Sequence, residues 1–149
     1  MGEVVQLDGS EGEGGGQILR TALALSVITR RAFEIFNIRA GRKRPGLRPQ
    51  HLACVKAAAR IAAAEVQGAA IGSRTLRFVP HDLRPGKYRF EIGTAGSTAL
   101  LFHTVYLPLA LAGSRSVLSL GGGTHVPFSP SFHYLRDPVS YTQLTLPTN

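Results

Sequence analysis

The sequence predicts an α/β protein built from stacked, similar modules. A strand, a turn of small residues, a helix and a second strand follow one another over residues 4–38, and the same order returns over residues 88–120. In both copies the chain passes from a strand through small residues straight into a helix, at residues 14–16 and 93–96. Repetition of one supersecondary unit is typical of α/β proteins made of stacked modules. Because residue identity between the copies is low, the repeat is one of structure.

The first copy contains four predicted elements. Residues 4–7 are expected to form a short strand, and residues 9–16 form a glycine-rich turn. Residues 17–28 have helical spacing, because their apolar positions fall near one face. Residues 33–38 alternate in polarity as a half-buried strand does. The helical face consists of Ile18, Leu19, Ala22, Leu23, Ser26 and Val27.

The segment between the copies adds a helix and two strands. A basic loop punctuated by glycine and proline covers residues 40–47. Pro49 suits the first turn of a helix, where its missing N–H costs nothing, and this helix is expected to reach about residue 65. Its inward positions are Leu52, Val55, Ala59 and Ala62. Strands are then expected over residues 65–71 and 75–79, joined by a Gly-Ser turn.

The second copy begins with a strand over residues 88–92 and a small-residue turn over residues 93–97. An apolar helix over residues 98–111 and a strand over residues 116–120 follow. From residue 137 the chain loses any helical period, and the string from Pro138 resembles a translated sequencing adapter. We therefore expect residues 1–136 to be native and residues 137–149 to be a non-native tail.

Composition narrows the classes of protein. The chain of 149 residues has enough apolar residues for one domain with a core. It has no run of roughly 18 apolar residues that would span a membrane, and its N-terminus does not resemble a signal peptide. Its single cysteine, Cys54, fits a reducing compartment, so we expect a cytoplasmic protein without a membrane partner. The net charge of +8 favours an anionic partner.

The basic residues are unevenly distributed. No acidic residue occurs between Glu34 and Glu65, and this stretch holds seven of the 17 basic residues. The seven are Arg39, Arg42, Lys43, Arg44, Arg48, Lys56 and Arg60. Arginine forks match phosphate oxygens, and a loop rich in glycine and proline can fix their geometry. The window therefore predicts a phosphate site, although a solvated basic face without a ligand has the same composition.

The glycine turn before the first helix points to the same chemistry. Glycines let the backbone come close to a ligand, and the first N–H groups of a helix form an anion site. The spacing matches neither a Walker A loop nor a dinucleotide turn. A flexible glycine loop that binds no ligand is therefore an alternative interpretation. Glu11 and Glu13 would repel a phosphate unless a divalent cation lies between them. Alternatively, they are acids favoured by the helix dipole.

Other site chemistries find no support in the pattern. The five histidines and Cys54 have no zinc-ligand spacing, and no Gly-x-Ser-x-Gly elbow of a hydrolase occurs.

Five co-linear motifs together resemble the RNA 3′-terminal phosphate cyclase family, from about residue 5 to residue 136. They are Leu-Asp-Gly-Ser-Glu-Gly-Glu-Gly-Gly-Gly-Gln-Ile-Leu-Arg at 7–20, Ile-Arg-Ala-Gly-Arg at 38–42, Pro-Gly-Leu-Arg-Pro-Gln-His at 45–51, Thr-Ala-Gly-Ser at 94–97 and Gly-Gly-Thr-His-Val-Pro-Phe-Ser-Pro at 122–130. The resemblance covers the first part of the family's length, somewhat under half. Residues 1–136 would then be the first module of the catalytic domain and the start of the second.

The resemblance implies a fold and an activity. The fold has a larger domain of repeated βαβαββ-type units plus a small inserted domain, and it is related to that of enolpyruvyl transferases. The activity is that of a ligase: ATP adenylates a histidine of the enzyme, and AMP passes to an RNA 3′-phosphate. The vicinal 2′-hydroxyl then attacks, giving a 2′,3′-cyclic phosphate. ATP, a divalent metal (Mg or Mn) and an RNA 3′-phosphate end are the implied cofactors and partners in RNA processing.

Site residues carry over by position. Glu13 matches the family's metal-binding glutamate, and Pro130 matches a residue that lines the adenosine pocket. His103 stands where the family usually has a glutamine that contacts the nucleotide. The positions expected to serve phosphates of ATP or of the RNA end are Gly14, Gly15, Gly16, Arg20, Arg39, Arg42 and Gln50.

The family's nucleophilic histidine lies near its C-terminus, and none of the five histidines here matches it. Because nucleophilic catalysis needs that group, we expect no catalytic residue within this fragment and no activity from it alone. Two alternatives stay open: a non-catalytic cyclase-like RNA-binding factor in ribosomal RNA maturation, and an enolpyruvyl-transferase-like enzyme. Retention of Glu13 with Arg20, Arg39 and Arg42 favours the cyclase, since a pure binding protein need not keep a metal carboxylate.

Overall fold

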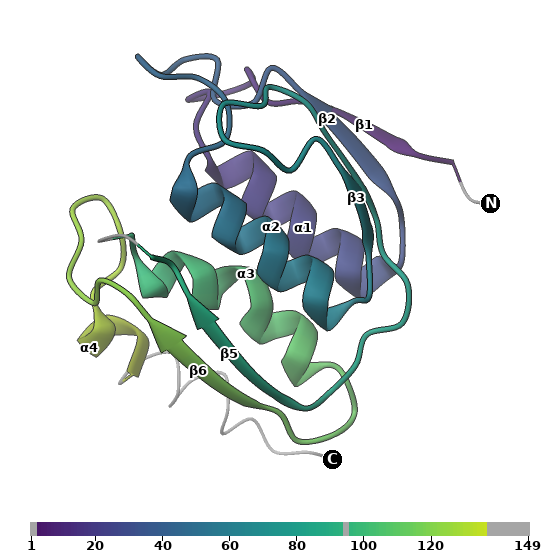
Figure 1. Cartoon of the computed structure of the whole chain (residues 1–149), viewed down its shortest axis with the longest axis vertical. Coiled ribbons are helices and arrows are strands. Elements are labelled where there is room, and N and C mark those ends of the chain that lie inside the picture. The colour runs from purple at the N-terminus through teal and green to yellow at the C-terminus, as the bar shows by residue number, and fades with distance from the viewer. Residues whose placement is uncertain (1–2, 94–95, 137–149) are drawn as a thin grey trace.

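The computed structural model describes residues 3–93 and 96–136. Along the chain the elements are β1 (Val5–Asp8), α1 (Gln17–Thr29), β2 (Phe33–Phe36), α2 (Pro49–Ile61), β3 (Glu65–Gln67), β4 (Leu76–Val79), β5 (Lys87–Glu91), α3 (Thr98–Ala110), β6 (Val117–Gly121) and α4 (Phe132–Tyr134). Each strand and helix expected from the sequence is present within one to four residues of its predicted ends. Helices α1, α2 and α3 lie between two sheets (Figure 1).

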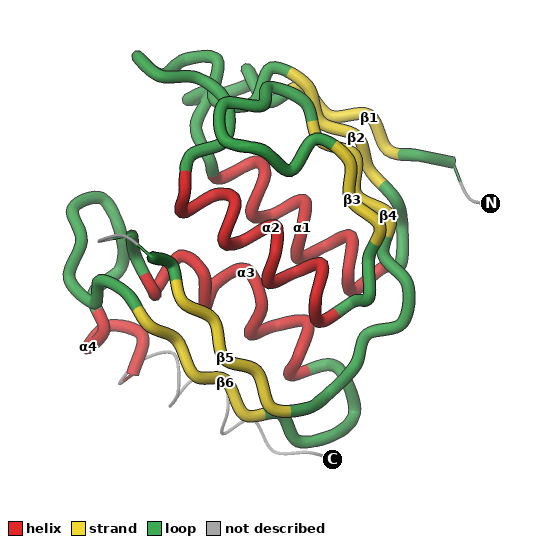
Figure 2. The backbone as a smooth tube through the Cα atoms, viewed as in Figure 1, coloured by secondary structure: helices red, strands yellow, loops and turns green. Residues whose placement is uncertain are grey.

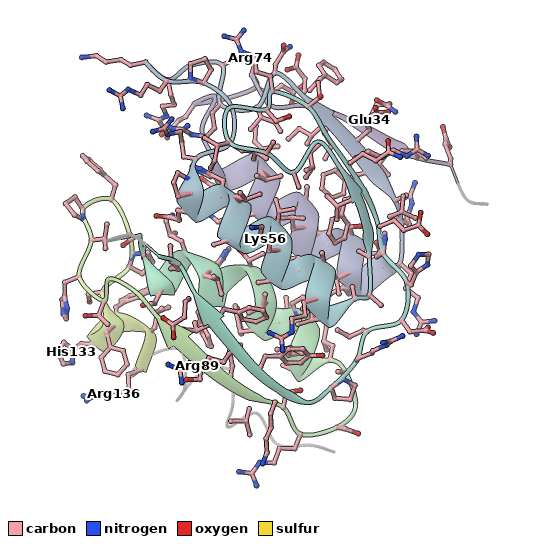
Figure 3. The ribbon with its side chains drawn as sticks, in the orientation of Figure 1. Glu34, Lys56, Arg74, Arg89, His133 and Arg136 are labelled. Atoms are coloured by element: carbon pink, nitrogen blue, oxygen red, sulfur yellow. The ribbon has the colours of Figure 1, made fainter. Side chains whose placement is uncertain are left out.

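The first sheet has the strand order β1-β2-β4-β3. Strands β1 and β2 run parallel with Val5 opposite Phe33, and β4 runs antiparallel to both β2 and β3. Alternation along β2 and β4 places Phe33, Ile35 and Phe78 in the core. On the opposite face Gln6 donates to Glu34 across the strands, and Glu34 projects away from the helices (Figure 3). One face of this sheet is thus solvated.

The predicted structural repeat is confirmed. Strands β5 and β6 form a second, two-stranded parallel sheet with Lys87 opposite Val117, and α3 connects them as α1 connects β1 and β2. Helix α3 is capped at its N-terminus by Ser97, whose Oγ accepts the Leu100 N–H at 3.3 Å. The order of the first six elements, βαβαββ, agrees with the unit that the family resemblance implied.

The core lies where the helices meet each other and the first sheet. Helix α3 packs against both α1 and α2. Buried side chains include Leu19, Leu23, Leu101 and Val105, and Cys54 is buried among them as a free thiol. Burial raises the pKa of the Cys54 thiol, so this cysteine is a core residue rather than a nucleophile.

The prediction that α2 reaches residue 65 was wrong. The helix ends at Ile61, because Ala63 takes a left-handed φ of 46° and the Ala64 N–H turns back to the Ala59 carbonyl. Of the positions predicted to face inward, Val55 and Ala62 are buried, whereas Leu52 and Ala59 are half-buried.

The strand predicted over residues 65–71 stops at Gln67. Gly68 has φ +81°, and a Cβ there would overlap the Thr75 carbonyl oxygen, so the chain turns at this glycine. Residues 137–149, the expected tail, lie outside the described residues. In the part of the chain that is described, no helix has the length and apolar character that a membrane crossing requires.

Candidate functional site

The glycine turn after β1 is held at its start by Asp8. The Asp8 Oδ1 accepts the Ser10 N–H at 2.9 Å, the Ser10 hydroxyl at 2.7 Å and the Asn37 amide at 3.2 Å. The bonds from Ser10 are the largest cause that lowers the pKa of this carboxyl. Asp8 is therefore occupied in shaping the turn and does not project toward a ligand.

The glycine turn and the basic loop approach each other backbone to backbone. Gly14 has φ +55°, and a Cβ there would lie 2.9 Å from the Gly41 nitrogen. The loops before α1 and α2 thus lie together at one end of the first sheet (Figure 2), where Arg74 also projects (Figure 3). Side chains of the basic loop consequently stand beside the glycines.

Helix α1 starts without a side-chain cap. Gly16 is the N-cap residue, and no acidic side chain lies in the first turn. Its carbonyl accepts the Arg20 N–H at 3.2 Å, which begins the helical pattern. The N–H groups of the first turn therefore keep their ability to bind an anion.

Three arginines from two segments, α1 and the loop after β2, meet at this helix end. Arg42 lies over the turn, 2.9 Å from the place a Cβ of Gly15 would take. Arg39 is held in place by its own Nη1, which donates to the Arg44 carbonyl at 2.8 Å and to the Gly46 carbonyl at 3.0 Å. A Cβ on Gly16 would lie 3.0 Å from Nη1 of Arg20.

The charges of Arg20 and Arg39 are not neutralised by the protein. Burial is the main cause that lowers the pKa of both guanidinium groups, and Arg48 and Arg42 add repulsion at Arg39. Within residues 3–93 and 96–136 no carboxylate pairs with either side chain. Partly buried cations without a counter-ion are costly, so this end of the molecule would gain free energy from a bound anion.

These groups line one open cavity of about 1030 Å³. The predicted site residues that it brings together are Glu13, Gly14, Gly15, Gly16, Arg20, Arg39 and Arg42. Glu11 and Phe128 also line it. Gln50, His103 and Pro130 are not part of its lining.

Gln50 is half-buried and His103 is exposed, both outside this lining. The Oε1 of Gln50 accepts the Ser97 N–H at 3.1 Å, so the side chain joins α2 to the turn before α3. Its amide NH₂ is the part left to donate to a ligand. The pKa of His103 is lowered by burial and then by the Arg20 guanidinium.

His51, the third residue of α2, also reaches this site, although it was not among the predicted site residues. Its Nδ1 accepts the Arg48 N–H at 3.3 Å, and its Nε2 lies against Gly16. Burial, followed by repulsion from Arg39, Arg20 and Arg48, lowers its pKa to about 4. The ring is therefore neutral at pH 7 with its proton on Nε2. Its place as the third residue of a predicted helix, three after the N-cap Arg48, was the available signal.

The residues at the cavity mouth also fit the implied divalent cation. The Glu13 side chain is 91% exposed, and its Oε2 lies 3.6 Å from Nη2 of Arg42. In the described residues no three His, Cys, Asp or Glu side chains gather into a metal site. A hard cation here would thus be held by one carboxylate together with substrate phosphates and water, which is how Mg²⁺ is usually bound.

Comparisons with known proteins show the family of this chain. A sequence model described as RNA 3′-terminal phosphate cyclase matches residues 11–144. The chain is 54% identical over 134 residues to the RNA 3′-terminal phosphate cyclase of Caldivirga maquilingensis, covering 89% of this chain and 38% of the relative.

Two further relatives are similar at the same level. The cyclase of Archaeoglobus fulgidus is 51% identical, with 90% of this chain and 41% of the relative covered. That of Salmonella enteritidis is 50% identical, with 91% and 40% covered. The chain thus spans about two fifths of the length of these relatives. With the family model matched over most of its residues, the chain belongs to the RNA 3′-terminal phosphate cyclase family.

Proposed function

We propose that this chain is the phosphate-binding portion of an ATP-dependent enzyme that converts an RNA 3′-phosphate into a 2′,3′-cyclic phosphate. The observation that carries the proposal is the pair of partly buried, unneutralised arginines, Arg20 and Arg39, at an uncapped helix N-terminus. Phosphate groups are the anions that such donors bind best. ATP and RNA 3′-phosphate both supply them.

The lining residues have distinct proposed roles. Backbone N–H groups at Gly15 and Gly16 surround phosphate oxygens, and Arg20 and Arg39 neutralise their charge. The Gly14 N–H donates to the Glu11 carbonyl at 3.0 Å, so Gly14 contributes by letting the backbone come close to the phosphates. Arg42 is less constrained, since its side chain is 48% exposed and its Glu13 partner is largely in solvent. Exposed pairs of this kind contribute little free energy, so Arg42 can move from the carboxylate to a phosphate at small cost.

Glu13 would hold the cation with the phosphates of ATP, and the cation would neutralise the charge that develops as pyrophosphate leaves. We propose that three further residues contact the nucleotide: Gln50 from α2, His103 from α3 and Pro130 from the loop after β6. His103 keeps one donor or acceptor for that contact.

The reaction proposed for the whole protein has three displacements at phosphorus. A histidine nitrogen attacks the α-phosphorus of ATP and pyrophosphate leaves. An oxygen of the RNA 3′-phosphate then attacks the histidine-bound AMP and frees the histidine. Finally the 2′-hydroxyl, losing its proton, attacks the 3′-phosphorus and AMP leaves. This chain's residues bind and orient the phosphates for these steps.

The nucleophilic histidine is proposed to lie outside residues 1–149, so this chain alone should bind phosphates without forming an AMP adduct. His51 is the most buried histidine, and its Nδ1 is already occupied by the Arg48 N–H. Residues 1–136 are proposed to be the first module and the start of the second. A cytoplasmic location in RNA processing belongs to the same proposal, supported by the lone, buried thiol.

A chimera tests the proposal directly. Residues 1–136 are fused to the remaining part of the Archaeoglobus fulgidus cyclase and incubated with labelled ATP and magnesium or manganese. We expect an acid-labile, histidine-linked AMP adduct and cyclisation of a 3′-phosphorylated RNA. The chimera carrying Arg20→Ala should lose both the AMP adduct and the cyclisation. The matched control carries Lys56→Ala on the exposed face of α2 (Figure 3), and it should keep both activities.

The same experiment separates the alternative function. A folded chimera that binds RNA and forms no adduct would contradict the cyclase and favour a non-catalytic RNA-binding factor in ribosomal RNA maturation.

A further inference from the structure

Phe128 is the most exposed large hydrophobic side chain of the described residues, with a relative exposure of 105%. It lies in the loop between β6 and α4, and its φ of 62° is in the left-handed region. A bulky residue adopts this region only where surrounding contacts impose it. Its exposure therefore needs an explanation beyond chance placement of an apolar side chain.

The loop that carries Phe128 is fixed on both sides. The Ser129 N–H and hydroxyl both donate to the Val126 carbonyl, at 3.2 and 2.8 Å, which closes a turn around Phe128. The Phe132 N–H donates to the Thr124 carbonyl at 3.2 Å. The Gly123 N–H donates to the Gly96 carbonyl at 2.9 Å, which ties the loop to the turn before α3. The ring is thus presented at the tip of a closed turn.

The ring of Phe128 lines the same cavity as Gly15, Gly16 and Arg20. The cavity combines phosphate donors from the first βαβ unit with one aromatic face from the second. Leu7, Ile18 and Leu25 also line the cavity, but Phe128 is the only aromatic residue among its described lining, so it supplies the π-face on which a nucleotide base can stack. With about 1030 Å³, the cavity is at the upper end of single-ligand sites, and it has room for a base beside the phosphates.

We propose that Phe128 stacks on the 3′-terminal nucleobase of the RNA whose 3′-phosphate is bound by the glycine turn and the arginines. This inference rests on the proposed function. Pro130, the position that corresponds to the adenosine pocket, lies outside the lining of this cavity. The base proposed at Phe128 belongs to the RNA, and the adenine of ATP is the competing occupant of this ring. Stacking on a π-face accepts every base, so the contact would fix the terminal nucleoside without reading its sequence.

The absence of tryptophan from the chain gives a direct probe. In Phe128→Trp the only indole lies at the proposed contact, and its fluorescence is titrated at sub-micromolar protein with a short 3′-phosphorylated oligoribonucleotide. We expect strong quenching, because a base stacks on the indole. The matched control is Phe132→Trp, since Phe132 is 47% exposed and lines a separate groove beside α3. This control should respond weakly.

An affinity cycle completes the test. By filter binding, Phe128→Ala should weaken binding of the 3′-phosphorylated oligonucleotide by roughly tenfold to a hundredfold. Phe128→Ala should not weaken binding further when the terminal nucleotide is abasic, because the contact between base and ring is then already absent.

Three results would overturn the inference. If the oligonucleotide binds Phe128→Trp without quenching, the stacking fails and the phosphate site stands. If ATP quenches and RNA does not, the base at this ring is adenine. If the unsubstituted chain binds no 3′-phosphorylated end at all, both the stacking and the proposed function fail.

Discussion

Glu13 and Arg42 oppose each other across two loops at the mouth of the cavity, and both are largely exposed. Such a pair contributes little to stability. The pair matters for binding instead. The two groups are 3.6 Å apart, and each can leave the other for a stronger partner: the Glu13 carboxylate for a cation, and the Arg42 guanidinium for a phosphate.

Removing the Glu13 carboxylate should therefore affect metal-dependent binding and leave the fold unchanged. We expect Glu13→Gln to weaken ATP binding in magnesium by at least about tenfold, because the cation loses its protein ligand. Calorimetric titration with and without magnesium measures this. Glu11→Gln, a change in the same turn, is the control and should keep the magnesium dependence. Equal magnesium dependence in both variants would contradict the assignment.

His51 should make stability depend on pH. Its folded pKa of about 4 lies below the unfolded value near 6.5, so between these values the unfolded chain binds the proton more readily. The free energy of unfolding should therefore fall by about 2 kcal/mol from pH 7 to pH 5. Below about pH 4 this contribution stops changing.

Urea unfolding at several pH values tests this expectation. His51→Gln should remove most of the loss between pH 7 and pH 5, and His133→Gln, on the exposed α4 (Figure 3), should retain it. An unchanged pH profile in His51→Gln would show that the imidazole is not the group responsible.

At the scale of elements, the site depends on two loops that meet without side chains between them. Gly14→Ala should cost about 2 kcal/mol or more, because left-handed backbone strain adds to a Cβ placed 2.9 Å from the Gly41 nitrogen. Gly12→Ala is a matched control with φ +59° and open space around its Cβ, and it should cost only about 1 kcal/mol of strain. Thermal unfolding of both variants gives the difference, and equal losses would exclude an energetic role for the loop contact.

The elements themselves were largely predictable, because their signals are local. Periodicity located α1, a continuous apolar run located α3, and small residues before each helix located both turns. The end of α2 was not predictable, since Ala63 turns left-handed where the sequence offers neither glycine nor proline.

At the scale of the whole molecule, several large apolar side chains face solvent. Leu25, Leu107 and Leu111 are 53%, 40% and 61% exposed. Since the chain spans about two fifths of its relatives' length, we propose that further modules cover these faces. We expect the isolated chain to self-associate, as truncated repeat arrays do.

Light scattering across a concentration series measures the self-association, and Leu111→Lys should reduce it while Arg115→Lys, nearby and also exposed, should not. A monomer with a sharp, cooperative melt would contradict the expectation.

The candidate site shows where sequence reasoning stops. The resemblance of the motifs at 7–20 and 38–42 to the cyclase family implied that Glu13, Arg20, Arg39 and Arg42 share a site, and they line one cavity. The bond from Ser97 to Gln50 and the contact of His51 with Gly16 did not. They join segments far apart in the chain, and no local period encodes which helix end will meet which turn.

The contact between Gly14 and Gly41 also has a genetic consequence. A clash between two side chains can be relieved by shrinking either one, but here the obstacle to a larger residue is main-chain nitrogen, which no substitution removes. Second-site suppressors of Gly14→Ala should therefore be absent at position 41, and a reversion screen should recover glycine itself. Both positions should tolerate fewer residue types than Gly12, whose surroundings are empty.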